Sequence, residues 1–344
     1  MNEEQQLIGE MARRMLTDHC SAEVIDRAEQ GDFPELLWTL LDDNGLTTLG
    51  VAESSGGAGG SFGDALVVLR EAGRKAAPLP LAETLLAGQV LSQLGQRLPE
   101  GPVSLVQGSV TLTESGQLQG VVQGVKFARY CKTLLVVAQR GDASMICQIP
   151  ADAVVITHSK DLAGEASDTV QVATTVQPEA CFAINDAELD AVLVWGAAMR
   201  AVMMAGALEE ALAATVGYSL ERKQFGKAIA KFQAIQQQLA VFATQVAAST
   251  RAAETLMVQS EVAVIDVAIA KARIGEAAGI CAEIAHQVHG AIGYTRDHRL
   301  NHLTRRLWSW RDAFGHEAYW QERLGRTLLA DETGDLWQQV TALG

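Results

Sequence analysis

Hydrophobic residues recur at helical spacing in two separate parts of the chain. The first part is residues 1 to about 95, where four leucines illustrate the pattern: Leu36, Leu37, Leu40 and Leu41. In the last part, one stripe advances by three or four residues at a time: Phe232, Ile235, Leu239, Phe242 and Val246. Helices are predicted there at about 187–219, 232–259, 262–289 and 298–329, so this part is expected to form a four-helix bundle.

The region between these two parts has a different pattern. Five short runs from residue 101 to about 185 are rich in valine, isoleucine and threonine: VSLVQGSVTL, TLLVVAQ, SMICQIP, AVVITHS and TVQVATTVQ. Glycine, aspartate, serine and proline separate the runs, which is typical of strands, and no helical pattern interrupts them. The predicted fold is therefore mainly α with a small β domain. An N-terminal helical domain (1–100) precedes a middle β-sandwich or barrel (101–185), and a C-terminal four-helix bundle (186–344) follows.

Composition and charge narrow the class of protein. Of the 344 residues, 48% are hydrophobic, which is enough to bury a core, and the net charge of −14 argues against nucleic-acid binding. The five cysteines are odd in number and form no CxxC pair, so we expect reduced, mostly buried thiols. The N-terminus has no apolar signal core, and no uncharged run of about 18 apolar residues appears. These features predict a soluble cytoplasmic protein with no membrane span.

Several kinds of site find no support in the sequence. The segment GVAESSGGAGGSFGDAL (50–66) lacks GK[ST] and a preceding strand, so we interpret it as a loop between helices, with Ser61 or Asp64 capping the next helix. His298 and His302 have i, i+4 spacing but no third ligand, so a solvated helix face is expected and no metal site is predicted. No GxSxG elbow supports hydrolase chemistry.

Two junctions between predicted helices contain residues that could bind a cofactor. In the first, ERKQFGKAIAKFQ (221–233), Phe225 and Gly226 are expected to end one helix, and a new helix is expected to start near Ala230. The free N–H groups of that helix, the forked cation of Arg222 and the amide of Gln224 suit a planar cofactor that carries a pyrophosphate. Composition alone favours the alternative, a helical hairpin with a solvated basic turn. The second junction is HQVHGAIGYTRD (286–297).

A family resemblance favours the cofactor. The stretch LERKQFGKAIAKFQAIQQQLA resembles the R-x-x-FG-x-x-I-x-x-FQ-x-x-x-x-x-LA signature of the acyl-CoA dehydrogenase family, and HQVHGAIGYTRDHRLNHLTRR resembles its Q-x-x-GG-x-GY turn. LWTLLDDNGLTTLGVAESSGGAGGSFGD resembles its N-terminal loop. These FAD-dependent enzymes of lipid and fatty acid metabolism oxidise acyl-CoA thioesters to 2-enoyl thioesters. The resemblance covers nearly the whole chain and is weakest over 100–185.

The resemblance implies a set of FAD contacts. At the first junction it implies pyrophosphate and adenosine contacts from Arg222, Gln224 and Phe225, and an adenine lining from Ile229, Phe232 and Ile235. At the second junction it implies contacts to the cofactor of a neighbouring subunit: Gln287, Val288, Gly290 and Ala291. An electron-transferring flavoprotein as acceptor and a homo- or hetero-oligomer, dimer or tetramer, are implied as well.

The catalytic base of the family is missing from both of its usual positions. Counting from the two junctions places these positions at Phe314 and Gly196, and neither residue is an acid. Asp312, Glu317 and, as a weaker candidate, Asp190 are near enough in sequence to substitute. The alternative for Asp312 and Glu317 is that they are solvated or paired with neighbouring arginines.

The middle domain also departs from the family. A stretch of residues that family members have in this domain is absent here, and no tryptophan lies between Trp38 and Trp195. In these respects the chain is similar to the short subunit of heteromeric bacterial acyl-CoA dehydrogenases. Three hypotheses remain: a dehydrogenase acting alone or in a complex, a non-catalytic partner that completes FAD sites, and a cofactor-free helical scaffold.

Overall fold

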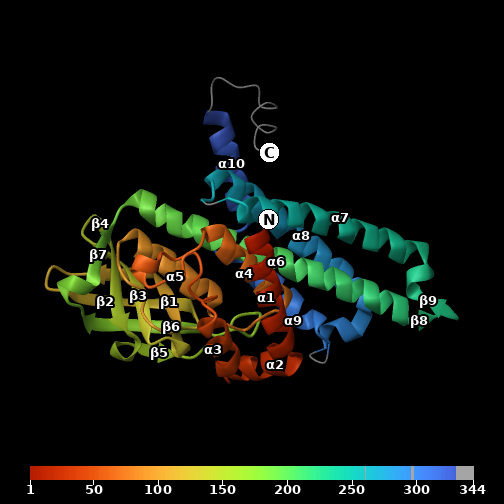
Figure 1. Cartoon of the computed structure of the whole chain (residues 1–344), viewed down its shortest axis with the longest axis horizontal. Helices are drawn as coiled ribbons and strands as arrows, with labels where there is room; N and C mark the ends of the chain where they lie inside the picture. The colour runs from red at the N-terminus through yellow and green to blue at the C-terminus, as the bar shows by residue number, and fades with distance from the viewer. Residues whose placement is uncertain (260, 296–297, 331–344) are drawn as a thin grey trace. The chain divides into compact units, whose positions relative to one another are not determined.

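The computed structural model describes residues 1–259, 261–295 and 298–330. Helices come first, strands occupy residues 103–184, and helices follow, which confirms the predicted order (Figure 1). Contacts divide the chain into two compact units. Unit 1 contains residues 1–9, 66–76 and 196 onward, and unit 2 contains residues 10–65 and 77–195. The three-domain division at 100 and 185 stays a prediction.

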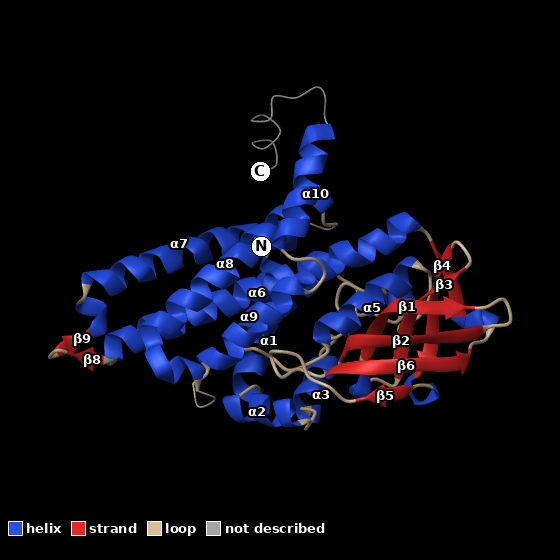
Figure 2. Cartoon of the chain, turned by 180° about the vertical axis from the view of Figure 1, so that it is seen from behind, coloured by secondary structure: helices blue, strands red, loops and turns tan. Residues whose placement is uncertain are grey.

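Unit 2 is built around a β-sheet. Within the described residues its seven strands follow the order β5-β6-β2-β1-β3-β4-β7 (Figure 2). The bounds are β1 Val103–Leu112, β2 Gln117–Lys126, β3 Thr133–Arg140, β4 Ala143–Pro150, β5 Val155–Thr157, β6 Ser167–Thr175 and β7 Cys181–Ile184. β1 and β3 pair in parallel, whereas the other neighbouring strands pair antiparallel. Alternating residues such as Val106, Val136 and Val170 fill one hydrophobic core.

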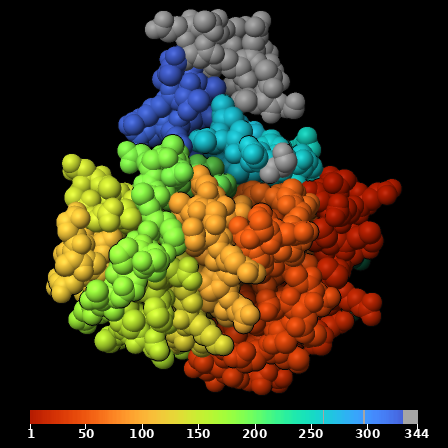
Figure 3. Space-filling model, turned by 60° about the vertical axis from the view of Figure 1, so that its left-hand side comes forward, coloured from red at the N-terminus to blue at the C-terminus, as the bar shows by residue number. Residues whose placement is uncertain are grey.

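Helices complete unit 2. They are α2 (Ala22–Gln30), α3 (Glu35–Asp43) and α5 (Leu81–Gln93), together with parts of α1 (Glu3–His19) and α4 (Phe62–Arg74). α5 packs against β1, and its orange atoms lie beside those of the sheet in Figure 3. At the start of α4 the main-chain N–H of Ser61 donates to the Asp64 carboxylate, and that of Asp64 donates to the Ser61 hydroxyl. Both predicted capping residues therefore cap this helix reciprocally.

Unit 1 is helical. It contains most of α6 (Asp186–Glu221), with α7 (Gln233–Met257), α8 (Val264–His289), α9 (Leu300–Asp312) and α10 (Glu317–Ala330). α8 packs against α7, α9 and α10. α4 and α6 cross closely, because a Cβ at Gly73 would overlap the carbonyl of Met203 and one at Gly206 would overlap that of Arg70. Beside this crossing, the Glu209 carboxylate accepts from Arg70 and Arg74.

One predicted helix is wrong in extent. The expected helix at 298–329 is two helices, α9 and α10, because Phe314 and Gly315 adopt left-handed φ angles of 55° and 90° between them. The indole N–H of Trp320 donates to the Phe314 carbonyl at 2.9 Å and fixes this turn.

α6 is long and apolar enough to cross a membrane by length and composition. However, 83% of its apolar window is buried inside the fold, which is expected of a core helix rather than a membrane span.

Candidate cofactor-binding site

The first junction is a β-hairpin rather than a simple break between helices. β8 (Lys223–Gln224) pairs antiparallel with β9 (Lys227–Ala228). Phe225 and Gly226 form the turn, with φ of 51° and 78°, as the twist of a two-residue hairpin requires. A 3-10 turn, η5 (Ile229–Lys231), precedes α7. The predictions that Phe225 and Gly226 end a helix and that a helix begins near Ala230 are therefore wrong, since α6 ends at Glu221 and α7 begins at Gln233.

The hairpin presents several of the predicted cofactor residues to solvent. Arg222 and Gln224 are exposed, and the ring of Phe225 is 90% exposed. The Phe232 ring lies edge-on to Phe225, with centroids 6.1 Å apart, and the Lys227 ammonium lies 4.4 Å from its centroid. The result is a basic surface with exposed aromatic faces, which suits a planar anion.

Apolar residues support the hairpin from below. Ile229 is buried, and Phe232 and Ile235 are half-buried. Along the predicted stripe, burial is complete only farther into α7, at Phe242 and Val246. No side chain caps the N-terminus of α7 at Phe232, so the free N–H groups predicted at a helix start are present, although at a later residue than expected.

The second junction follows α8. Gly290 has φ of 67° and is followed by the 3-10 turn η6 (Gly290–Tyr294). Gln287, Gly290 and Ala291 are exposed, whereas Val288 is buried. A Cβ at Gly290 would meet nothing within 4 Å, so the main chain there is open to a ligand.

The structure brings the two junctions to the same end of unit 1. The Tyr218 ring of α6 stacks on the His289 ring of α8, with centroids 4.4 Å apart. Arg222 follows Tyr218 by one turn, and its main-chain N–H donates to the Tyr218 carbonyl at 2.8 Å. The two junctions therefore lie at one end of unit 1, and the donors of the first junction, an exposed guanidinium and amide beside an aromatic face, fit a dinucleotide.

Two buried histidines lie beside this surface, and the sequence reasoning missed them. The His289 Nδ1–H donates to the Ala285 carbonyl at 2.8 Å. His286 Nε2 lies 3.0 Å from the Thr304 hydroxyl, which itself donates to the Leu300 carbonyl, so His286 is the donor there. Among the described residues, His286 Nδ1 and His289 Nε2 find no hydrogen-bond partner. The i, i+3 spacing of these histidines before a glycine was the only available signal.

The two histidines singled out from the sequence lie elsewhere than expected. His298 precedes α9, and His302 is fully buried within it. The predicted solvated helix face is therefore wrong, because the first turn of α9 packs His302 inward.

Burial lowers the pKa of His286, His289 and His298, because desolvation disfavours the imidazolium. Below the ordinary histidine pKa of 6.5, these imidazoles bind protons in the unfolded chain more readily than in the folded protein. The contribution of these histidines to the free energy of unfolding is therefore fully present above pH 6.5 and is lost as the pH falls.

We accordingly expect the free energy of unfolding to fall between pH 7 and pH 5, by at most about 1.4 kcal/mol per pH unit for each buried histidine. Urea unfolding at stepped pH measures this slope. His286→Gln is expected to reduce the slope, and His158→Gln, at an exposed position, is the matched control. An unchanged slope in His286→Gln would contradict the assignment.

Gly196 and Phe314, the two positions at which the sequence led us to expect a base, meet in space. A Cβ at Gly196 on α6 would overlap the Phe314 ring, so the ring lies directly against the glycine. The Lys271 ammonium of α8 donates to the carbonyls of Arg311 and Gly315 at 2.6 and 2.7 Å. Together with the hydrogen bond from the Trp320 indole to the Phe314 carbonyl, these contacts hold the main chain before and after Phe314.

Lys271 is itself unusual, because its side chain is completely buried. Desolvation lowers its pKa to about 7, and the charges of Glu317 and Asp312 offset part of that effect. Its two carbonyl contacts give the lysine a structural role in the turn between α9 and α10.

The substitute acids differ in environment. The Arg311 guanidinium donates to the Glu317 carboxylate, with Nε to Oε2 at 2.8 Å, and this bond lowers the Glu317 pKa to about 2. Asp312 is exposed at the end of α9, and Asp190 lies near the start of α6. A base for a weakly acidic carbon needs a raised pKa, so the environment of Glu317 favours the structural alternative.

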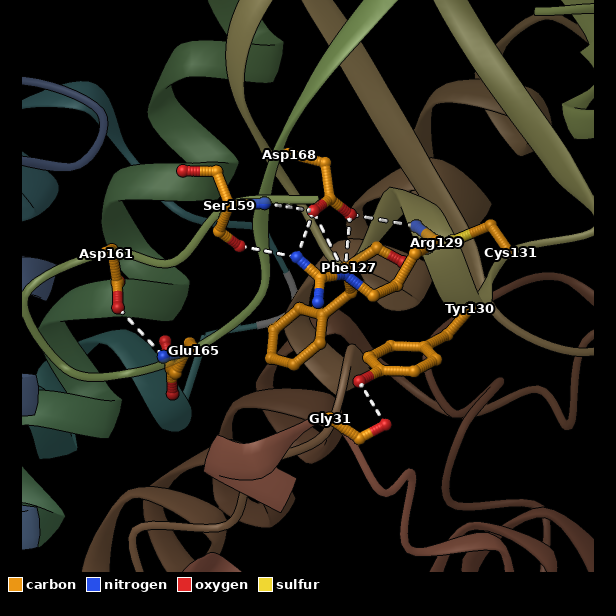
Figure 4. Close-up of polar contacts among 9 residues, drawn as sticks. All are labelled: Gly31, Phe127, Arg129, Tyr130, Cys131, Ser159, Asp161, Glu165 and Asp168. Atoms are coloured by element: carbon orange, nitrogen blue, oxygen red, sulfur yellow. Dashed lines mark hydrogen bonds and ion pairs between the residues drawn. The ribbon is translucent and has the colours of Figure 1, made fainter. Parts of the chain in front are cut away.

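In the β domain, a buried ion pair anchors the segment that follows β2. The Arg129 guanidinium pairs with the fully buried Asp168 carboxylate, and Figure 4 shows the two facing one another. Asp168 also accepts from the main-chain N–H groups of Arg129 and Ser159, at 3.0 and 3.1 Å. The Tyr130 hydroxyl donates to the Gly31 carbonyl at 3.1 Å. This network fixes the segment after β2, which begins with Phe127 at a φ of 54°.

Comparisons with known proteins agree on one family. Residues 2–97 match the model "Acyl-CoA dehydrogenase, N-terminal domain", and residues 189–329 match "Acyl-CoA dehydrogenase, C-terminal domain". The chain is 29% identical over 309 residues to acyl-CoA dehydrogenase IpdE2 of Mycolicibacterium smegmatis, covering 87% of this chain and 91% of that protein.

Solved structures share the fold. The ChsE4–ChsE5 complex of Mycobacterium tuberculosis superposes with a TM-score of 0.86 at 22% identity, covering 97% of this chain and 99% of that chain. PigA with FAD and proline superposes with a TM-score of 0.83 at 16% identity, covering 95% and 98%.

Proposed function

Because the chain belongs to the acyl-CoA dehydrogenase family, we propose that it is an FAD-binding subunit of a heteromeric enzyme that oxidises an acyl-CoA thioester to the 2-enoyl thioester. In this proposal a second, longer chain of the same family contributes the catalytic carboxylate. The observation that carries the partner role is the contact between Phe314 and Gly196. The two places for a base meet there, and an aromatic ring occupies the space.

FAD is the cofactor, and it supplies an acceptor for the hydride that leaves the β-carbon of the substrate. Within this chain the Arg222 guanidinium would hold the pyrophosphate, while Gln224 and Phe225 would bind the adenosine side. Ile229, Phe232 and Ile235 would line the adenine. Exposure of the three hairpin residues and the open N–H groups at the start of α7 support this assignment.

The second junction would serve a cofactor held by the neighbouring subunit. Gln287 offers an exposed amide, and Gly290 and Ala291 offer an exposed main chain that a ligand can approach closely. Val288 is buried and would act by keeping the end of α8 in place. Since both junctions lie at one end of unit 1, a partner that packs there would complete two sets of contacts.

Removal of the α-proton is the step that this chain is not equipped for. The proton is weakly acidic, so the base must lie within hydrogen-bond range and have a pKa near the working pH. Glu317 is held in an ion pair with a pKa of about 2, and such a carboxylate is a weak base. The geometry therefore supports a base that comes from another chain.

A self-sufficient dehydrogenase is the second candidate, and one observation favours it. Asp312 is exposed beside the turn that carries Phe314, so a shift of this turn could bring its carboxylate toward the substrate. We also propose a cytoplasmic location and an electron-transferring flavoprotein as acceptor, in line with the family.

The assay for turnover separates these functions. We expect the purified chain alone to show no turnover with an acyl-CoA thioester and an artificial electron acceptor. Turnover is expected when a full-length family member from the same source, carrying the glutamate, is added. The same partner with its glutamate changed to glutamine is the control and is expected to restore nothing, because the carboxylate is the missing group.

Other outcomes have distinct meanings. Turnover by the chain alone that disappears in Asp312→Asn or Glu317→Gln would establish the self-sufficient dehydrogenase. Protein that stays free of flavin in every combination would support the cofactor-free scaffold instead.

A further inference from the structure

Two cysteines face one another across neighbouring strands of the β domain. β4 and β7 run antiparallel at one edge of the sheet (Figure 1), and Cys147 pairs directly with Cys181 in their register. The Cys181 thiol donates to the Cys147 sulfur, and the two sulfur atoms are 3.2 Å apart. All five cysteines, which lie within the described residues, are free of disulfide bonds in this structure.

This arrangement is close to what a disulfide requires. A disulfide has a sulfur–sulfur bond of about 2.05 Å, and its Cα atoms lie about 4.4–6.8 Å apart. Directly opposed residues of an antiparallel pair have Cα atoms about 4.5–5.5 Å apart, so the strands already hold the main chain at the needed spacing. Bond formation therefore asks for a small side-chain movement and no change of register.

The two thiols differ in access. Cys147 is completely buried in the core of the sheet, whereas Cys181 is partly exposed at the first residue of the edge strand. A small water-soluble oxidant can reach Cys181 from the solvent.

We propose that Cys147 and Cys181 form a redox-active pair that closes to a reversible disulfide between β4 and β7 when the protein meets a peroxide. The Cys181 thiol loses its proton, the thiolate attacks one oxygen of hydrogen peroxide, and the O–O bond breaks; Cys181 becomes a sulfenic acid, and the departing hydroxide takes up the Cys181 proton and leaves as the first water. The Cys147 sulfur then attacks the Cys181 sulfur, the S–O bond breaks, and a second water leaves with the Cys147 proton. Two thiols are oxidised and one peroxide is reduced to two waters.

The consequence for the fold is local. β7 ends at Ile184 and α6 begins at Asp186, so the bond would tie the strand that leads into the longest helix to the body of the sheet. Burial and the neighbouring thiol raise the pKa of Cys147, so Cys147 stays a thiol while the more exposed Cys181 meets the oxidant first. The pair does not depend on the proposed function, because it lies on the sheet edge and not on the hairpin.

Thiol counting tests the proposal. The native full chain is treated with hydrogen peroxide, quenched, denatured and titrated with a thiol reagent. The count is expected to fall from five to three, because one disulfide consumes two thiols, and to return to five with dithiothreitol. Peptide mapping without reductant is expected to show a linked pair containing Cys147 and Cys181.

Two variants sharpen the test. Cys181→Ser is expected to keep its four remaining thiols under the same mild treatment, whereas Cys281→Ser, which removes a buried cysteine elsewhere, is expected to lose two of its four. Equal thiol loss in Cys181→Ser and the wild type, or oxidation without the linked peptide, would overturn the proposal. An unchanged count of five in the wild type would overturn it as well.

Discussion

Changing Asp168 to asparagine is expected to lower the free energy of unfolding by about 3–5 kcal/mol. The carboxylate is fully buried, pairs with Arg129 and accepts two main-chain N–H groups. The asparagine keeps the shape but removes the charge, so the Arg129 cation is left without its counterion, and breaking a buried pair from one side is strongly destabilising.

Urea unfolding followed by circular dichroism measures this effect through the midpoint. Asp152→Asn is the matched control, because Asp152 is an exposed aspartate in the same β domain, and a change within about 0.5 kcal/mol is expected there. A further variant combining Asp168→Asn with Arg129→Met removes both charges and is expected to recover part of the loss.

The double variant shows whether the loss of stability comes from the unpaired charge or from lost packing. Arg129→Met is also measured alone. If the double variant loses as much free energy of unfolding as Asp168→Asn and Arg129→Met lose together when made singly, the loss comes from packing and not from the unpaired charge. If Asp168→Asn unfolds at the wild-type midpoint, the ion pair contributes little, and the segment after β2 must be held by other contacts such as Tyr130 to Gly31.

The order of elements was predictable because hydrophobic period is a strong signal. The stripe from Ile235 to Val246 does lie on one helix, with Phe232 at its N-terminal cap, and the β-rich runs do form one sheet. The length of a segment and the spacing of its hydrophobic residues are local properties, so they can be read from the sequence without knowledge of tertiary contacts. The reciprocal cap of Ser61 and Asp64 was predictable for the same reason.

The misses depend on contacts that local patterns do not record. The break between α9 and α10 needs a left-handed Phe314, which is held by Lys271 and Trp320 from distant parts of the sequence. The hairpin at Phe225 and Gly226 combines a left-handed aromatic residue with a glycine, and the strong helical neighbours on both sides concealed it. At Phe314 tertiary contacts override helix propensity, whereas at the hairpin the local pairing of β8 with β9 does so.

The candidate cofactor residues stay predictions from the sequence, whereas the geometry of the segments that carry them came from the fold. Arg222 and Phe225 came from the family signature, while their place on an exposed hairpin came only with the fold. The contact between Phe314 and Gly196 joins residues more than a hundred positions apart, so no sequence pattern could show that these two expected base positions meet. The buried pair of His286 and His289 needed the packing of α8 against α9 in the same way.

Changing Arg222 to alanine is expected to weaken FAD binding about tenfold to a hundredfold, because a charge-assisted bond to a phosphate contributes about 1.5–3 kcal/mol. The side chain is exposed at the end of α6, so its loss should leave folding intact, and an unchanged circular dichroism spectrum checks this. Binding is measured by titrating FAD into apoprotein, and retention by the flavin released per chain on denaturation.

Lys223→Ala is the matched control for Arg222→Ala, because Lys223 is the next residue, is equally exposed and carries the same charge on β8. A general electrostatic effect would weaken both variants alike, and salt would abolish it. A forked contact to the pyrophosphate predicts that Arg222→Ala loses flavin while Lys223→Ala keeps most of it, and that Arg222→Lys recovers little, since the ammonium cannot bind two oxygens in the planar geometry of a guanidinium. Flavin retention equal to the wild type in Arg222→Ala would exclude this residue from the cofactor site and would leave the N-terminus of α7 as the remaining anion site on the hairpin.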